Sequence, residues 1–452
     1  MSRDRYTPQS GDPNIRVDHY DLSITYKVST NRLDGVAIVR GRVTAPTMSV
    51  SLDLVGLRAT KVMVDGRRAP AFNQSDRRLR VSLRNALAID EPFEITVVYG
   101  GAPHPRRSRW GTIGWEELDD GALVASQPTG APTWFPCNDV PVDKATYALS
   151  VTTDRAYSVI ASGVRAHERS ERGGSATWTF DQAAPTSTYL MTVTIGRYVE
   201  QKMQLGGIAG RLHFPAALAG RANADFAELP AMMTFFEERF GPYPLPEYTV
   251  VVTADDLEIP LEAQGLGMFG ANHIEGTGSY ERLIAHELAH QWFGNSVGVA
   301  EWKDIWLNEG FACYAEWLWA EHSGSASAHR RALDYHARLA ALPQDLVLSD
   351  PGPALMFDDR VYKRGALTLH ALRLTVGDDT FFALLRAWTS ERGGGTATTA
   401  DFIALATSMS KKPVGDLLHT WLDLVPLPAL PTARRSVISR SIRPRLARSP
   451  RR

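Results

Sequence analysis

Residues 286–316 read HELAHQWFGNSVGVAEWKDIWLNEGFACYAE, and this stretch decides how the second half of the chain folds. Apolar residues recur at helical spacing from Tyr280 onward without a proline, which predicts a helix over residues 280–294. Positions four apart on a helix lie one above the other, so His286 and His290 can present ring nitrogens to one metal ion. Glu287 then lies beside a metal-bound water, where a general base acts.

A second helix is expected to supply the third ligand, because a catalytic zinc ion takes three protein ligands and keeps a fourth position open. Eighteen residues separate His290 from Glu309. That length lets the first helix end near Gly294 and a second helix run over residues 307–322. The pattern predicts a zinc-dependent hydrolase with one zinc ion per chain, bound by His286, His290 and Glu309.

Glu316 lies seven residues after Glu309, two helical turns further along the same face. Two interpretations stay open at this stage. Glu316 accepts the second ring N–H of a ligating histidine, or it is an ordinary solvated or packing glutamate.

A His-Glu-x-x-His pattern alone also arises by chance in amphipathic helices, so the longer context carries the argument. The whole string 286–316 resembles the zinc-binding region of the aminopeptidase N family, a gluzincin group that also contains leukotriene hydrolases. The resemblance implies an α+β multidomain fold with a thermolysin-like, mainly helical zinc catalytic domain. It also implies aminopeptidase activity on peptide substrates with a free N-terminus.

The family carries a tyrosine downstream of the zinc helix in a Tyr-x-Lys/Arg-Gly-Ala setting. Residues 361–366, VYKRGA, fit that setting, so the resemblance assigns the tyrosine's role to Tyr362. Its phenol is expected to donate to the oxyanion of the tetrahedral intermediate.

The family also pairs the substrate ammonium with the glutamate of a Gly-x-Met-Glu-Asn motif upstream of the zinc helix. Residues 259–264, IPLEAQ, keep the acid as Glu262 but replace the glycine by Ile259 and the asparagine by Ala263. Pro260 removes a backbone donor near the expected path of an extended substrate. The resemblance assigns ammonium binding to Glu262, with weakened main-chain recognition of the peptide.

A second anchor for the amine in the family is a glutamine at the end of the N-terminal domain. Residues 126–139, SQPTGAPTWFPCND, resemble that segment and make Gln127 the candidate. Thr129 lies where a second carboxylate is expected. One acid in place of two predicts modest rather than tight binding of the amine.

Composition fits a soluble enzyme of two or three domains, with 44% hydrophobic and 22% charged residues in 452. The net charge of −1 conceals an asymmetry, because residues 434–452 contain eight arginines and no acid. The body before them is acidic, which gives no support for nucleic-acid binding. Two cysteines without CxxC spacing exclude a disulfide framework, and no apolar run spans a membrane. We therefore expect a cytoplasmic protein without a membrane or nucleic-acid partner.

The first two hundred residues alternate apolar and polar side chains in short runs, which predicts an antiparallel β-sandwich-like domain over residues 1–201. From residue 202 helical patterns dominate, including 222–240, 326–341, 364–374, 378–389 and 399–408, and we expect the catalytic domain to extend to residue 433. Residues 434–452 are expected to be a disordered extension. The longest family members add a large helical C-terminal domain, whose absence from this sequence predicts a more open substrate channel.

Three functional alternatives follow. The first is a zinc aminopeptidase in which Glu287 moves the proton and Glu262 with Gln127 holds the amine. The second is an endopeptidase, or a hydrolase of another small substrate, which would keep the metal residues without needing Glu262. The third is a non-catalytic scaffold on the same fold, disfavoured because the base and all three ligands are present.

Overall fold

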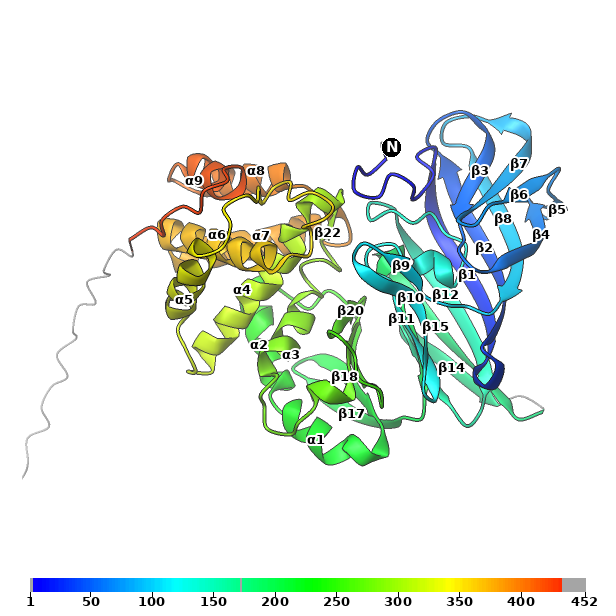
Figure 1. The fold of residues 1–452 in the computed structure, drawn as a ribbon, viewed down its shortest axis with the longest axis horizontal. Coiled ribbons are helices and arrows are strands. Elements are labelled where there is room, and N and C mark those ends of the chain that lie inside the picture. Colours follow the sequence, from blue (N-terminus) through cyan, green and yellow to red (C-terminus); the bar gives the residue numbers. More distant parts are fainter. Residues whose placement is uncertain (1–2, 171–172, 433–452) are drawn as a thin grey trace, which may run out of the picture.

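The computed structural model describes residues 3–170 and 173–432, so the predicted arginine-rich extension at 434–452 lies outside the described residues. The chain forms a β-rich N-terminal half and a mainly helical second half that lie side by side (Figure 1). This arrangement confirms the predicted fold class. Among the described residues, no helix is both long and apolar enough to cross a membrane.

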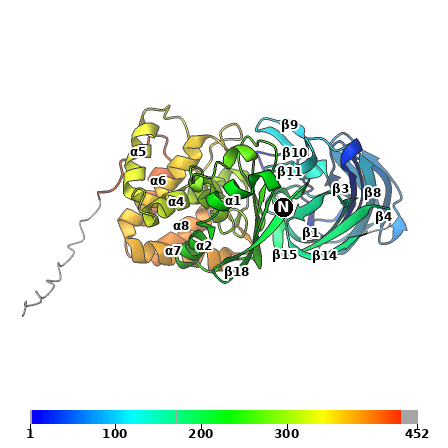
Figure 2. The same cartoon turned by 90° about the horizontal axis from the view of Figure 1, so that it is seen from below.

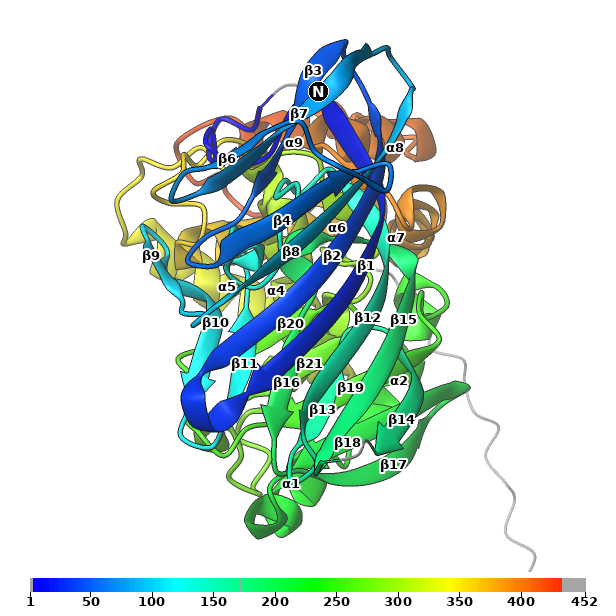
Figure 3. The same ribbon diagram turned by 90° about the vertical axis from the view of Figure 1, so that its right-hand side faces the viewer.

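Sixteen strands in the described part of the N-terminal half form three sheets. The largest has eight strands in the order β14-β15-β12-β1-β2-β8-β4-β5, and its broad face is seen in Figure 3. The second sheet has the order β13-β16-β11-β10-β9, and the third β3-β7-β6. The strands are β1 (Ile15–Lys27), β2 (Arg32–Val43), β3 (Thr47–Asp53), β4 (Arg58–Val64), β5 (Arg67–Arg68), β6 (Phe72–Gln74), β7 (Arg78–Leu87), β8 (Pro92–Gly101), β9 (Arg106–Ser108), β10 (Gly111–Leu118), β11 (Gly121–Ala125), β12 (Lys144–Asp154), β13 (Ser158–Ala161), β14 (Val164–Ser170), β15 (Ser175–Ser187) and β16 (Val193–Gly196).

The β-rich half departs from a purely antiparallel domain at one place. β1 runs parallel to β12, with His19 opposite Thr146 and Thr25 opposite Thr152. Alternation of apolar and polar residues reveals strands but not their direction, and a parallel pair needs a long connection. Here that connection contains ten other strands, so the pairing is set by tertiary packing rather than by local sequence.

The second half contains a five-stranded sheet with the order β17-β18-β19-β21-β20. The helix that carries His286 packs on this sheet. β20 (Leu261–Ala263) is its edge strand and pairs antiparallel with β21 (Leu266–Phe269). The other strands are β17 (Val199–Leu205), β18 (Ile208–Phe214) and β19 (Glu247–Val252). The proposed domain boundary between residues 201 and 202 falls inside β17, which pairs with β18 and therefore belongs with the second half.

Nine α-helices lie in the described part of the second half (Figures 1 and 2). They are α1 (Ala219–Asp225), α2 (Leu229–Phe240), α3 (Glu281–Ala289), α4 (Trp306–His322), α5 (Ala328–Ala340), α6 (Asp359–Val376), α7 (Asp378–Arg392), α8 (Thr399–Met409) and α9 (Val414–Leu422), with the short pair β22 (Gly298–Val299) and β23 (Thr396–Ala397).

The helix predicted over 222–240 is two helices, because the chain turns at residues 226–228 before Pro230 enters the first turn of α2. Pro230 suits a first turn, where its missing N–H costs nothing. α3 is also shorter than the predicted 280–294, since it ends at Ala289 and a turn follows. In that turn the N–H groups of Asn295, Ser296 and Val297 donate to the carbonyls of residues 290, 291 and 292.

The segment before β1 bridges the two halves. Asp4 accepts from the Trp302 N–H at 2.6 Å, and Arg5 pairs with Asp350 at 2.9 Å in the second half. Asp12 anchors the same segment to the N-terminal half, where its N–H donates to the side chain of Asn138 at 2.7 Å. Figure 1 shows this segment between the halves.

Candidate active site

Helices α3 and α4 bring the predicted metal ligands together. The Nε2 atoms of His286 and His290 lie 3.6 and 3.4 Å from Oε2 of Glu309. One donor atom from each of the three residues lies within 4.8 Å of the other two, and all three side chains are buried. Two imidazole nitrogens and a carboxylate oxygen are the donor set of a catalytic zinc site.

The other ring nitrogen of each histidine is already engaged. His286 Nδ1 lies 2.7 Å from Oε1 of Glu316, and His290 Nδ1 lies 3.0 Å from the Phe293 carbonyl oxygen. Both partners are acceptors, so each ring in its neutral form carries its proton on Nδ1 and can offer the Nε2 lone pair to a metal. Of the two interpretations of Glu316, the structure places it against the histidine, with Arg282 Nη1 3.1 Å from its second oxygen.

The electrostatics of the site favour a cation. Four carboxylates, those of Glu262, Glu287, Glu309 and Glu316, surround the two imidazoles. Burial alone would lower the pKa of both histidines, but Glu309 and the neighbouring carboxylates raise the pKa of His286 to about 9 and that of His290 to about 10. In the absence of a metal the imidazoles thus take up protons, which is the behaviour of a site built to hold positive charge.

Glu287 projects from α3 beside these donors. Burial, followed by the Glu262 carboxylate, raises the pKa of Glu287 to about 7, although the two histidines oppose that shift. Its Oε2 atom is buried and has no hydrogen-bond partner among the described residues. A buried acceptor left open in this way suits a group that takes a proton from a bound molecule.

Tyr362 reaches the site from α6 because α4 and α6 cross at two glycines. A Cβ on Gly310 would lie 2.8 Å from Cα of Gly365, so any larger residue would force the helices apart. Gly310 follows Glu309, and Gly365 lies one turn after Tyr362. The close crossing stacks the Tyr362 ring on that of His286, with centroids 6.1 Å apart and an interplanar angle of 18°.

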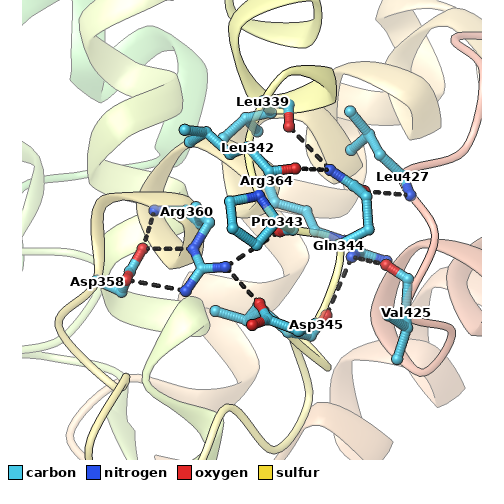
Figure 4. Close-up of polar contacts among 11 residues, drawn as sticks. Leu339, Leu342, Pro343, Gln344, Asp345, Asp358, Arg360, Arg364, Val425 and Leu427 are labelled. Atoms are coloured by element: carbon cyan, nitrogen blue, oxygen red, sulfur yellow. Dashed lines mark hydrogen bonds and ion pairs between the residues drawn. The ribbon is translucent and has the colours of Figure 1, made fainter.

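Two arginines fix the start of α6 (Figure 4). Arg360 binds Asp358 at 2.8 Å and Asp345 at 2.6 Å. The buried guanidinium of Arg364 donates to main-chain carbonyls on two segments that flank the helix. These carbonyls belong to Leu346, Trp421, Leu424 and Val425. Arg364 lies two residues beyond Tyr362. The segment 421–425, which accepts three of these hydrogen bonds, therefore helps to hold the tyrosine in place.

Glu262 and Gln127 meet across the boundary between the halves. Nε2 of Gln127 donates to Oε1 of Glu262 at 2.7 Å. Glu262 lies on the edge strand β20, and one of its oxygens lies within 4.8 Å of donor atoms of Glu287 and His290. Thr129 is buried, and its hydroxyl has no partner among the described residues. Ile259, which replaces the family glycine, is 61% exposed beside this strand.

Sequence reasoning missed Tyr189 and Lys144, which approach the site from the N-terminal half. Tyr189 is buried, and burial together with the Glu262 and Glu309 carboxylates raises its pKa well above the usual value. Lys144 donates to the turn that follows α3. Lys144 begins β12 and Tyr189 lies in the short 3-10 helix after β15, and neither position in the sequence reveals a contact across a domain boundary.

Comparison with known families divides the chain into two matched regions. Residues 16–190 match the peptidase M1 N-terminal domain, and residues 225–421 match the peptidase family M1 domain. Among curated proteins, the chain is 25% identical to human glutamyl aminopeptidase and 26% identical to leucyl aminopeptidase of Saccharolobus solfataricus. Those alignments cover 91% and 95% of this chain but 47% and 55% of the relatives, so the chain spans about half the length of these relatives.

Solved structures match over nearly their full length. The crystal structure of an M1 zinc metallopeptidase from Deinococcus radiodurans has a TM-score of 0.88 and 33% identity, and covers 95% of this chain and 99% of that one. A mutant of the Deinococcus protein bound to the substrate Tyr-Ser-Ala has a TM-score of 0.87 and 32% identity, covering 94% and 98%. The buried His-His-Glu donor set and these matches lead to one conclusion: the chain belongs to peptidase family M1, the zinc metallopeptidases.

Proposed function

We propose that the protein is a zinc aminopeptidase that hydrolyses the first peptide bond of peptides with a free N-terminus. One zinc ion per chain would be held by His286, His290 and Glu309. The observation that carries the proposal is the hydrogen-bonded pair Glu262–Gln127 beside the metal donors. A carboxylate this close to the metal both attracts an ammonium group and leaves little room for residues that precede it.

The zinc ion, when bound, supplies a Lewis acid that polarises the scissile carbonyl and lowers the pKa of water. Glu287 accepts the water proton at Oε2 and delivers it to the nitrogen of the leaving amine. The Tyr362 hydroxyl donates to the oxygen that gains negative charge, a contribution that is about 2.7–4 kcal/mol in other enzymes. Glu316 and the Phe293 carbonyl hold the two imidazoles in their orientation.

Glu262 and Gln127 position the substrate. The ammonium lies against the Glu262 carboxylate, while Gln127 fixes that carboxylate through its amide. Pro260, directly before β20, has no backbone N–H to donate to an extended peptide. The peptide would therefore be held mainly by its amine, and the modest amine binding expected from one acid in place of two stays a prediction.

The relatives support this class of substrate. The curated relatives are named as aminopeptidases, and the similar Deinococcus metallopeptidase has been solved with a tripeptide substrate. The proposal leaves the preferred first residue open, and the cytoplasmic location stays a prediction from the sequence.

A reconstitution experiment tests the proposal. The purified protein is stripped with a chelator and titrated with zinc while hydrolysis of a panel of aminoacyl chromogenic substrates is followed. We expect activity to return and to level off at one equivalent of zinc. Full activity in the stripped protein, or no activity on any free aminoacyl substrate at any zinc concentration, would overturn the proposal.

A further inference from the structure

Three successive carbonyls in the turn after α3 accept hydrogen bonds from the N-terminal half. Lys144 Nζ donates to the carbonyl oxygens of Asn295 at 2.7 Å and Ser296 at 2.8 Å. The Tyr189 hydroxyl donates to the Gly294 carbonyl oxygen at 3.4 Å. The turn that ends the zinc helix is therefore held by side chains from the other half of the molecule.

Burying the Lys144 ammonium at the boundary between the two halves costs free energy. Its ammonium is withdrawn from water, which lowers its pKa to about 7, and the two carbonyls are its only hydrogen-bond acceptors in the described structure. Removing a cation from water without a carboxylate partner costs more than packing an apolar side chain of the same size. Packing between the two halves alone would not require a lysine here, whereas the carbonyls of Asn295 and Ser296 require a donor.

The turn connects two parts of the active site. The Phe293 carbonyl orients His290 through Nδ1, and the Asn295 N–H donates to the His290 carbonyl at 3.0 Å. The Asn295 side chain donates to the Ala263 carbonyl at 2.9 Å, one residue from Glu262. A shift of this turn therefore moves a metal ligand and the amine-binding strand together.

The structure makes room for the lysine. A Cβ on Gly298 would lie 3.2 Å from Cε of Lys144 and 3.3 Å from the Gly294 carbonyl oxygen. Those distances are tighter than ordinary contact, so the glycine leaves the space through which Lys144 reaches the turn. Gly298 of the second half thus leaves the space that Lys144 of the N-terminal half occupies.

We propose that Lys144 is a positioning residue for the catalytic centre, which fixes the turn at residues 293–296 so that His290 and Glu262 keep their places. The inference rests on the proposed zinc site and adds to it that the N-terminal half is part of the active-site scaffold. Tyr189 assists by holding the first carbonyl of the same turn.

The test compares Lys144→Met, which keeps an unbranched side chain out to the position of Cε but removes the donors, with a matched variant on the same strand. Tyr147 donates to the Thr186 carbonyl at 3.1 Å inside the N-terminal half, and Tyr147→Phe removes that buried bond without touching the second half. Both variants are expected to lower the melting temperature. Only Lys144→Met is expected to release zinc faster, by about tenfold, a size typical of lost support around a metal ligand.

Zinc release into a chromogenic chelator, below the melting temperature of every variant, is the first measurement. Amide hydrogen exchange of residues 290–297 in the metal-free protein is the second, and we expect it to accelerate in Lys144→Met and not in Tyr147→Phe. If Lys144→Met loses stability while zinc release stays within twofold of the wild type and exchange in the turn is unchanged, Lys144 only joins the domains and the inference is overturned.

Two further outcomes are a Lys144→Met variant that does not fold and a wild-type protein that binds no zinc. Should Lys144→Met fail to fold, Gly298→Ala displaces the same lysine with a single methyl group, and the same two measurements decide. Should the wild-type protein bind no zinc, the proposed function fails, whereas hydrogen exchange of the turn in the metal-free variants still confirms or overturns the role of Lys144.

Discussion

The proposed metal centre and the proposed amine site lie next to each other but are built in different ways. The metal donors come from one stretch of sequence that contains α3 and α4, and both histidines have a second buried contact that fixes the orientation of the ring. The amine site joins Glu262 of the second half to Gln127 of the first by one hydrogen bond of 2.7 Å on an edge strand. The metal donors are thus specified within one stretch of sequence, whereas the amine site takes its side chains from both halves.

Replacing the base should have the largest effect. Glu287→Gln keeps the shape of the side chain but cannot take a proton, so kcat is expected to fall by about 10²–10⁴. Zinc content measured by atomic absorption should stay at the wild-type value, because Glu287 is not among the three donors. Activity within threefold of the wild type would exclude Glu287 as the base.

The crossing of α4 and α6 comes next. Gly365→Ala places a methyl group 2.7 Å from Cα of Gly310, so the helices must separate and Tyr362 must withdraw from the metal side. A misplacement of about 1 Å can cost about 10²-fold in rate, and we expect a loss of that order in kcat. As a control, Gly415→Ala on α9 meets no atom within 4 Å and should leave kcat unchanged. Equal activity of both variants would contradict the role of the crossing.

The amine site should respond in KM and selectivity rather than in metal content. Glu262→Gln removes the charge that holds the ammonium, so we expect kcat/KM for free aminoacyl substrates to fall about tenfold to a hundredfold, with zinc retained. Gln127→Ala removes only the neighbouring amide and should cost a few-fold. Loss of zinc from Glu262→Gln would contradict the expectation that amine binding and metal binding depend on different residues.

The smallest effect concerns how protein stability changes with pH through Asp139, in the segment of the N-terminal half that also contains Gln127. Burial, then Asp53, raises the pKa of Asp139 to about 7, and its Oδ2 has no partner among the described residues. The folded state therefore binds this proton more tightly than the unfolded state, and stability from it is lost as pH rises from about 4 through 7. Asp139→Asn is free of that loss, so its melting temperature relative to the wild type should increase between pH 5 and pH 8.

Calorimetry at several pH values checks the last prediction. A difference in melting temperature between Asp139→Asn and the wild type that stays constant over this range would show that Asp139 is ionised in the folded protein at pH 5.

The sequence predicted the parts that depend on local spacing. The four-residue interval between His286 and His290, and the helical pattern that brings in Glu309, are periodic features that a single chain displays. The same periodicity indicated most of the helices, although α9 was missed and the limits of α3 and α6 differed. For Glu316 the sequence left two interpretations open, and the structure shows its contact with His286.

Contacts between distant segments were not predictable in the same way. The parallel pair β1–β12, the contact of Gly310 with Gly365, and the bonds from Lys144 join residues that lie more than fifty positions apart. No local pattern encodes such pairs, because they depend on how whole elements pack. The amine site lay between these extremes, since its residues followed from a family resemblance and their mutual contact came only from the fold.

The proposed activity requires a free amine on the substrate, because the ammonium would pair with Glu262. The kcat/KM of the zinc-loaded protein is compared for one chromogenic aminoacyl substrate and its N-acetylated form. We predict rapid hydrolysis of the free substrate and at least about a hundredfold slower hydrolysis of the acetylated one, because the blocked nitrogen cannot pair with Glu262. Equal hydrolysis of the two would contradict the account, leaving a zinc hydrolase that does not read the N-terminus.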